Sequence, residues 1–390
     1  MPTSDNTRNL IAACAAITVF GLAFGMTYPL LSLILEGRGV STGMIGINSA
    51  MMPMGILLFS SVIPVAAKRF GSRNLAVAAA LATSVFILAY KVFDTLEAWF
   101  VIRLLQGMSI STLFVLSEAW IVGFAGSENR GKVVAIYASA LSASFGAGPA
   151  IVGWIGIEGW APFVIGSLVI LVGVIPLTLV REAHTEQPEE KQTSGLFEFA
   201  PKAPMLLTAV GAFAIFDAAT LSLLPVYGVH NGLSVATSAA ALTALIFGNV
   251  VLQFPIGWLA DKYPHRLVLA GCASVTVLGL LLLPLVMNSF WMWPTLVLIG
   301  ATGYGVYTVS LTSLGDRFSG PELVNGAAAF AVMWGAGALF GSVSGGWSMT
   351  VFGVHGLPLY LALVYLLLML GLIVRGRYLE SANVENKSSR

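Results

Sequence analysis

The sequence has few charged residues and almost no cysteine. Only 9% of its 390 residues are Asp, Glu, Lys or Arg, whereas 57% are hydrophobic. A soluble domain carries about 25% charged residues, so this chain is too apolar to be one. Its two cysteines, Cys14 and Cys272, have no second Cys and no His at metal-ligand spacing. We therefore expect an integral membrane protein in which the cysteines are packing residues and no metal or cofactor is bound.

Motifs of enzymes are lacking as well. The sequence contains no HExxH, no cofactor motif, and no Ser-Lys or Asp-Asp arrangement that would serve an intramembrane enzyme. The net charge is +1 and the cations form no single basic patch, which argues against nucleic acid as a partner. We expect a protein that is not an enzyme and has no catalytic residues.

Long apolar stretches fill nearly the whole chain. Each covers about 18 to 26 residues, enough for a helix to cross a hydrocarbon core of about 30 Å. We predict twelve spans at approximately residues 10–35, 44–67, 74–92, 98–124, 131–154, 160–180, 204–228, 235–260, 266–287, 291–314, 323–347 and 356–375.

The second half of the sequence repeats the first at an offset of 193 residues. Residues 64–75 (PVAAKRFGSRNL) align with residues 257–268 (GWLADKYPHRLV), and the same shift carries Gly107 onto Gly300. Large duplicated units in an apolar chain are typical of secondary transporters. We predict an all-α membrane protein with two pseudo-symmetric six-helix bundles. Its expected parts are an N-terminal bundle (1–180), a cytoplasmic linker (181–203), a C-terminal bundle (204–378) and a disordered cytoplasmic tail (379–390).

The distribution of Lys and Arg predicts the orientation. With both termini in the cytoplasm, sixteen of the nineteen Lys and Arg fall on cytoplasmic segments, as the positive-inside tendency requires. The reverse orientation would place them outside. We expect a multi-pass protein with both termini cytoplasmic.

The loop after the second span of each half combines small residues with charges. In the second half Gly257-x-Leu-Ala-Asp261-Lys262-x-x-x-Arg266 resembles the G-x-L-A-D-R-x-G-R-K loop of the major facilitator superfamily. In the first half Lys68 stands where this pattern has Asp. The resemblance implies the fold of that family and an ion-paired cytoplasmic gate, whereas topology-fixing charge alone is the alternative for the first copy. The residues expected at the gate are Asp261, Lys262, Arg266, Lys68, Arg69, Gly71 and Arg73.

The fourth predicted span carries two charges on one face. Arg103-Leu-Leu-Gln106-Gly107 is similar to the R-x-x-Q-G signature of the same family. Arg103 and Glu118 lie within about 60° on a helical wheel but roughly 22 Å apart along the axis, too far for a direct pair. Charges inside a span usually face an aqueous cavity. We expect both to line a cavity and to take part in proton coupling; the alternatives are a snorkelling Arg103 and a structurally hydrogen-bonded Glu118.

Asp217 lies near the middle of the seventh predicted span. The repeat places it on Phe24, and no cation lies within a helical turn or two, so a partner must come from another helix or from water. Removal from water favours the protonated form of a carboxyl group. Asp217 is our leading candidate for the proton-coupling site, and a permanently hydrogen-bonded structural Asp is the alternative.

The fifth predicted span contains Ser144-x-x-x-Gly148-Pro149-x-x-Val152-Gly153, which resembles the antiporter motif g-x-x-x-G-P-x-x-G-G of the family. In the family this motif implies export by exchange. As a bare pattern it indicates a bent, closely packed helix, because proline removes a backbone hydrogen bond. We favour antiport over symport or uniport and assign Gly148, Pro149 and Gly153 to this motif.

Polar and aromatic side chains inside the spans are candidates for a solute cavity. Each alone is an ordinary packing residue, but together they describe an amphipathic pocket with few charges, suited to a neutral, apolar or monocationic solute. They are Phe24, Tyr28, Gln106, Asn249, Gln253, Tyr304, Tyr307 and Trp334.

Two short segments narrow the resemblance. Ser117-Glu118-Ala119-Trp120 and Asn129-Arg130-Gly131-Lys132 resemble E-S-W and N-R-G-R of a bacterial subgroup often called YcaD-like. The resemblance implies a monomeric transporter of the bacterial inner membrane, in contact with lipid, that exports a small organic solute in exchange for protons. Uptake of a metabolite by symport or facilitated diffusion is one alternative. A transporter-like receptor or assembly protein is another.

Overall fold

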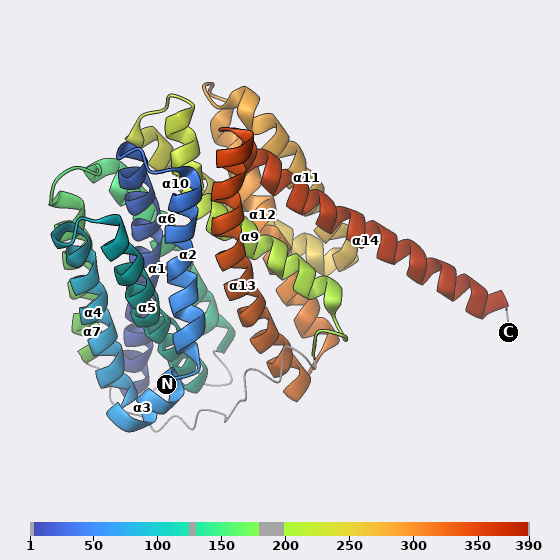
Figure 1. Ribbon diagram of the computed structural model, residues 1–390. Coiled ribbons are helices and arrows are strands. Elements are labelled where there is room, and N and C mark those ends of the chain that lie inside the picture. Colours follow the sequence, from blue (N-terminus) through green and yellow to red (C-terminus); the bar gives the residue numbers. More distant parts are fainter. Residues whose placement is uncertain (1–3, 125–129, 179–198, 389–390) are drawn as a thin grey trace.

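The structure is a computed structural model and describes residues 4–124, 130–178 and 199–388. All regular elements in this part of the chain are helices (Figure 1). Eleven of them are long and apolar enough to span a membrane, and α6 adds a shorter apolar stretch, Ser139–Ile155. The prediction of an all-α protein with twelve membrane-crossing helices is confirmed.

The helices fall into two groups of six long helices, with one short helix added. The first group contains α1 (Ser4–Gly37), α2 (Thr42–Ser60), the short α3 (Ile63–Phe70), α4 (Ser72–Val92), α5 (Leu96–Phe124), α6 (Arg130–Ile155) and α7 (Ala161–Thr178). The second contains α9 (Pro204–His230), α10 (Val235–Lys262), α11 (His265–Val286), α12 (Met292–Arg317), α13 (Pro321–Phe352) and α14 (Gly356–Ser388).

The sequence predicts one helix for the second span, residues 44–67, but the structure has two. The first, α2, ends at Ser60, and α3 begins shortly afterwards with Pro64 in its first turn. Proline has no N–H to donate, so it fits the first turn of a helix without the loss of a hydrogen bond. The corresponding α10 has Gly257 at the aligned position and continues to Lys262. The two halves therefore differ at the loop that carries the charged motif.

The end of the chain differs from its prediction too. The sequence predicts a disordered tail over residues 379–390, but α14 continues to Ser388 and extends away from the bundle (Figure 1). No Gly or Pro interrupts residues 377–388, so nothing in this segment breaks the helix. Most of the predicted linker, residues 181–198, lies outside the described residues.

Close glycine contacts reproduce the sequence repeat in three dimensions. A Cβ on Gly107 of α5 would lie 2.2 Å from the carbonyl oxygen of Met52 on α2. In the second half, a Cβ on Gly300 of α12 would lie 1.8 Å from the carbonyl oxygen of Leu245 on α10. Gly300 and Leu245 each lie 193 residues after Gly107 and Met52, which is the offset of the sequence repeat. Glycine at these positions lets the two helix backbones touch, which is how small residues serve helix packing in membranes.

The first helix of each half follows a slightly shorter offset. Gly148 packs on Gly25 of α1, and its repeat partner Gly341 packs on Ile215 of α9. Gly25 and Ile215 are closer in the sequence than the repeat offset requires. Asp217 therefore corresponds to Thr27 by contact, and not to Phe24 as a uniform offset predicts.

The two halves are joined at one end of the bundle, which we call the sealed end. There Thr42 donates a hydrogen bond to the carbonyl oxygen of Gly346 (3.1 Å), and the Gly43 N–H donates to the hydroxyl oxygen of Thr350 (3.0 Å). His230 at the end of α9 pairs with Glu36 at the end of α1 (2.5 Å). These contacts connect α1 and α2 of the first half to α9 and α13 of the second.

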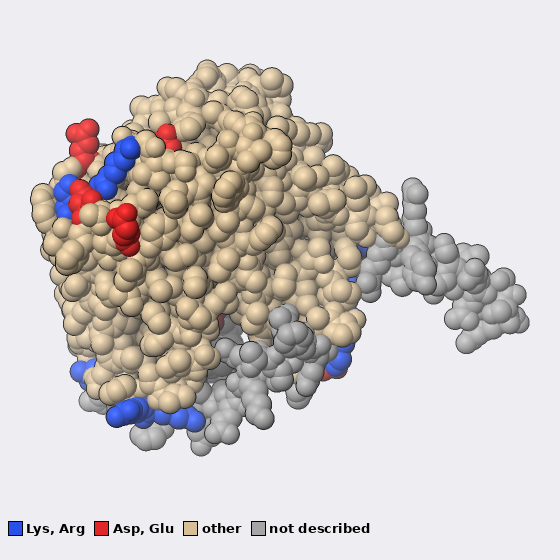
Figure 2. All heavy atoms as spheres, in the orientation of Figure 1, with Lys and Arg blue, Asp and Glu red and all other residues tan. Residues whose placement is uncertain are grey.

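The other end, where α3 lies, is called the α3 end. Lys and Arg side chains gather there in Figure 2, and a broad surface without charges separates them from the charges of both signs at the sealed end. An uncharged band between two charged rims is the surface expected of a protein that crosses a bilayer.

Candidate functional site

Asp217 is held by two hydrogen bonds from other helices. It is 5% exposed on α9, and its two carboxylate oxygens accept from the Tyr304 hydroxyl of α12 (2.9 Å) and from the Trp334 indole N–H of α13 (3.3 Å). The sequence predicts all three residues for the coupling site or the cavity, and the structure brings them together. No Lys or Arg among the described residues forms an ion pair with this carboxyl group. Removal from water disfavours the ionised form of a carboxyl group, whereas hydrogen bonds from donors such as these favour it.

Glu118 lies on the exposed face of α5, in contrast to its buried neighbour Ser117. Its side chain therefore differs in exposure from that of Arg103 on the same helix, which is fully buried. That Glu118 lines a cavity stays a prediction.

Aromatic rings line the contact between the halves close to Asp217. Phe24 of α1 lies 6.2 Å from Trp334 of α13 between ring centroids, and 4.7 Å from Tyr28. On the second half, Tyr304 and Tyr307 both pack against Phe213, at 5.7 and 4.8 Å. Five of the eight predicted cavity residues thus belong to two aromatic groups. Phe24, Tyr28 and Trp334 join the two halves, and Tyr304 and Tyr307 pack within the second half.

Arg103 does not face the cavity. Its side chain is fully buried (0% exposed), donates to the Asn48 side-chain oxygen (2.8 Å) and lies over the ring of Tyr28, 4.7 Å from the ring centroid. Full burial also excludes the alternative of snorkelling to the interface. Arg103 and Glu118, predicted to share one cavity-lining face, therefore have different surroundings.

Gln106 belongs to a buried hydrogen-bond chain within the first half and not to a cavity. It accepts from the Tyr90 hydroxyl (2.7 Å) and donates to Thr27 (3.2 Å). Of the two predicted residues on α10, Asn249 is half-buried, and Gln253 is exposed and donates to Thr308 over 3.4 Å. Within the described part of the chain, none of these residues forms a hydrogen bond with Asp217, Tyr304 or Trp334.

The antiporter-like segment of α6 packs on both halves. A Cβ on Gly148 would lie 2.4 Å from the backbone of Gly25 on α1, and one on Gly153 would lie 3.2 Å from the carbonyl oxygen of Ala236 on α10. Pro149 is buried inside α6. The segment is therefore a close-packed seam between the halves.

The cations of the second gate copy contact groups other than Asp261. Arg266 donates to the carbonyl oxygens of Leu372 (2.8 Å) and Ile373 (3.2 Å) on α14, and Lys262 lies 4.1 Å from the ring centroid of Trp258. Asp261 is exposed and makes no hydrogen bond or ion pair with another described residue.

The first gate copy surrounds the turn between α3 and α4. The Arg69 guanidinium lies 5.4 Å from the ring centroid of Phe70, and Gly71 caps α3 with a φ of 81°. Lys68 and Arg73 lie on either side of that turn. The predicted gate residues of this copy are thus close in the chain but lie on two helices.

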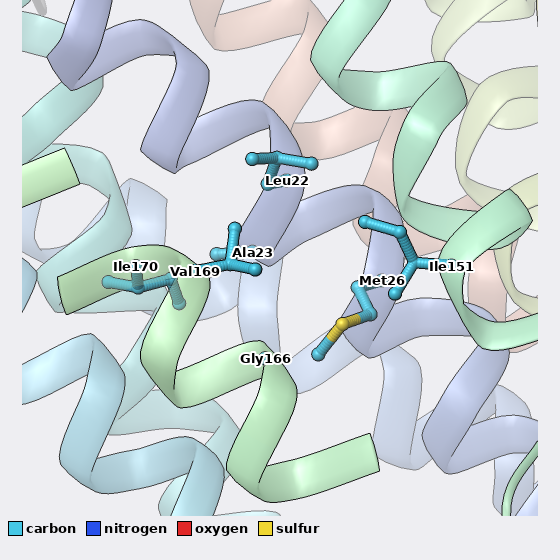
Figure 3. A pocket seen from close by; sticks show the side chains of 7 residues that line it. All are labelled: Leu22, Ala23, Met26, Ile151, Gly166, Val169 and Ile170. Carbon is cyan, nitrogen blue, oxygen red and sulfur yellow. The ribbon is translucent and has the colours of Figure 1, made fainter. Parts of the chain in front are cut away.

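A small pocket lies elsewhere, between α1, α6 and α7. Figure 3 shows that only apolar residues line it, among them Met26 and Gly166. It offers no hydrogen bond or charge to a solute. We interpret it as a packing defect and not as a binding site.

Several residues of this region were not predicted from the sequence. Asn48, Thr27 and Tyr90 hold the buried chain around Arg103 and Gln106, and Thr42 with Thr350 joins the halves. A lone amide in an apolar stretch, as at Asn48, is the one signal that would have found a member of this group.

The helix count, the repeat and the inter-half contacts define a membrane transporter built from two six-helix bundles. The sequence profile of the Major Facilitator Superfamily matches residues 13–324 and, in a second match, residues 206–390. The chain belongs to this superfamily.

Relatives and solved structures agree with this assignment. The MFS-type transporter YfkF of Bacillus subtilis is 26% identical over 373 residues, covering 91% of this chain and 93% of that protein. The MFS-type transporter YcaD of Escherichia coli is 24% identical over 342 residues, covering 87% and 88%. Both relatives carry names that describe them as uncharacterized.

Among solved structures, the nucleoside transporter NupG has a TM-score of 0.78 at 12% identity, covering 95% of this chain and 99% of that one. A D-xylose-proton symporter has a TM-score of 0.75 at 14% identity, covering 95% and 97%. At these identities the likeness shows the fold alone.

Proposed function

We propose that the protein exports a small organic solute in exchange for protons, by alternating access. The observation that carries this proposal is the position of Asp217, buried between three helices without a cation. Protonation of such a group removes a charge from a low-dielectric environment, so it changes which arrangement of α9, α12 and α13 is stable. Glu118, which water reaches, is proposed to pass the proton to or from the α3 end. Arg103 is proposed to set the electrostatic potential of the first half.

The arrangement of the halves supports an alternating mechanism. The sealed end closes one side of the seam, while Asp261 at the α3 end forms no ion pair with a described cation of the first half. We propose that this is the state open toward the cytoplasm, with both termini cytoplasmic as the Lys and Arg distribution indicates. In the opposite state Asp261 would pair with cations of the first copy, among them Lys68, Arg69 and Arg73, and close the gate.

The residues around Asp217 favour a particular kind of solute. Aromatic rings from both halves provide apolar faces, and the charged groups in contact with them are Asp217, bonded to Trp334, and Arg103, which lies over Tyr28. Such a surface with few charges suits a neutral, apolar or monocationic solute, because aromatic faces attract cations. Exchange, and therefore export, is favoured by the Gly148-Pro149 seam of α6.

We further propose that the protein lies as a monomer in the bacterial inner membrane, surrounded by lipid. The division at residues 181–203 is proposed as the linker between an N-terminal bundle (1–180) and a C-terminal bundle (204–378).

The proposal is tested with purified protein in liposomes that contain a pH-sensitive dye. Tetraphenylphosphonium serves as a monocation, and uridine and D-xylose serve as uncharged solutes. Exchange predicts proton movement opposite to that of an added solute, and Asp217→Asn abolishes it. Asp316→Asn, at an exposed carboxylate near His265 (3.4 Å), is the matched control and retains it.

Proton movement in the same direction as the solute would replace export by symport. Proton flux that persists in Asp217→Asn would remove Asp217 from the mechanism. Absence of flux with every solute, from protein that folds normally, would favour a receptor without transport.

A further inference from the structure

The buried guanidinium of Arg103 has more N–H donors than the surrounding residues accept. One nitrogen, Nη1, donates to the Asn48 oxygen (2.8 Å). The Nε and Nη2 atoms are buried and have no hydrogen-bond partner. A buried charged group with unsatisfied N–H groups is costly, so native proteins supply an acceptor.

The groups beside Arg103 are donors as well. The Tyr28 hydroxyl, whose ring lies under the guanidinium, is buried without a partner, and so is the Nδ2 amide nitrogen of Asn48. The Asn48 oxygen accepts from Arg103, and the Gln106 oxygen accepts from Tyr90. Three side chains from α1, α2 and α5, connected by the Arg103–Asn48 hydrogen bond and the Arg103–Tyr28 ring contact, thus carry four buried donor atoms without a partner.

No carboxylate compensates this positive charge within the first half. No described Asp or Glu forms an ion pair with Arg103. Asp217, on the second half, accepts from Tyr304 and Trp334 with one hydrogen bond to each oxygen. A buried cation without a partner is strongly destabilising, so a counter-charge is expected here.

We propose that Arg103, Tyr28 and Asn48 form a binding site for one small monovalent anion. The donors fit either a halide ion or the carboxylate group of a small organic acid, because both accept several hydrogen bonds and carry one negative charge. The site lies one ring away from Trp334, since Phe24 packs on both Tyr28 and Trp334. This inference does not depend on the direction or the coupling of transport.

The test measures the thermal unfolding midpoint, Tm, of the purified full-length protein in detergent at constant ionic strength. The sodium salt of HEPES, a bulky sulfonate without a carboxylate, is replaced stepwise by sodium bromide in one series and by sodium acetate in another. A specific site predicts a saturable rise in Tm, because a ligand that binds the folded state stabilises it by mass action. A rise with bromide alone assigns a halide, a rise with acetate alone assigns a carboxylate, and a rise with both assigns the shared chemistry.

Variants identify the site. Arg103→Gln loses the anion-dependent rise. Tyr28→Phe keeps the ring and removes one donor, so it weakens the apparent affinity by about fivefold or more, as expected for one hydrogen bond. Arg38→Gln is the matched control, because Arg38 also lies over a ring, 4.6 Å from the centroid of Trp99, but at the surface. It retains the full rise.

The variant Asn48→Asp distinguishes anion binding from a merely structural role of these residues. The new carboxylate would supply the missing negative charge next to Arg103. The Tm of this variant in the HEPES salt then reaches at least that of the unsubstituted protein in the stabilising anion, and added anion no longer raises it. The proposal is overturned if the protein has the same Tm in all three salts, or if Arg103→Gln and Arg38→Gln respond alike, which would indicate a general salt effect.

Discussion

Tyr304 of α12 donates its hydroxyl hydrogen to Asp217 of α9 over 2.9 Å. This bond connects the one buried carboxyl group of the described second half to a helix whose Tyr304 and Tyr307 rings pack on Phe213. A change in the protonation of Asp217 therefore changes a contact between two helices. The predictions below follow from this bond and from the contacts between the two halves.

Tyr304→Phe is expected to destabilise the protein more at pH 8 than at pH 5. A hydrogen bond to an ionised carboxylate contributes about 1.5 to 3 kcal/mol, and one to a neutral carboxyl group about 0.5 to 1.5 kcal/mol. Thermal unfolding at the two pH values measures the difference. Tyr307→Phe is the control, since the Tyr307 ring also packs on Phe213 but its hydroxyl has no hydrogen bond with the described residues. Equal losses at both pH values would show that the Asp217 carboxyl does not change its charge in this range.

Alanine at the repeated glycines should destabilise both halves to a similar extent. The added methyl of Gly107→Ala or Gly300→Ala would overlap a backbone carbonyl of the adjacent helix, and overpacking of this kind costs about 1 to 3 kcal/mol. Gly271→Ala on α11 has open space around the new Cβ and should have no such effect. The thermal unfolding midpoints of the three variants measure these losses of stability. A loss at Gly107 without one at Gly300 would contradict the equivalence of the two packing contacts.

Cysteines at Thr42 and Thr350 should form a disulfide that holds the sealed end closed. The two hydroxyl oxygens lie 2.9 Å apart, on α2 and α13. In a background without Cys14 and Cys272, oxidation is expected to stop solute movement, and reduction is expected to restore it. A crosslinked protein that still transports would show that this end does not open during the cycle.

Charge reversal at Asp261 should change the balance between states and leave the stability of the present state unchanged. Asp261 makes no contact here that Lys would break, so we expect a change in unfolding free energy within about 0.5 kcal/mol. Loss of the proposed gate pair in the opposite state should increase labelling of a cysteine placed at the exposed Gln253 on α10. Unchanged labelling would remove Asp261 from the gate. Asp316→Lys, at another exposed carboxylate of the α3 end, serves as the control for charge alone.

The sequence was sufficient for the architecture because its signals are strong at that level. Apolar stretches of membrane-crossing length and the internal repeat specify helix number and pairing, and Gly107 and Gly300 confirm the repeat at atomic contact. The break before α3 was missed because a proline within an apolar stretch is equally compatible with a kinked helix. The helix at residues 377–388 was missed because its polar composition, and not its helix-compatible residues, guided the prediction.

The candidate site was predicted in part. Asp217, Tyr304 and Trp334 are far apart in the sequence, yet each was found as a polar or aromatic group inside a span. The surroundings of Arg103 could not be predicted, because they depend on which face of α5 turns toward α1 and α2. Helical periodicity placed Arg103 and Glu118 on one stripe, but it does not show that the packing of the first half covers only one of them.

The most direct test of the central claim is a thermal-stability screen of the purified protein against drugs and metabolites at pH 6 and pH 8. If proton and solute compete for the region of Asp217, a stabilising compound should raise Tm less at pH 6 than at pH 8. In Asp217→Asn this pH dependence should disappear. A compound that stabilises the protein equally at both pH values, or whose pH dependence survives in Asp217→Asn, would contradict proton coupling at Asp217.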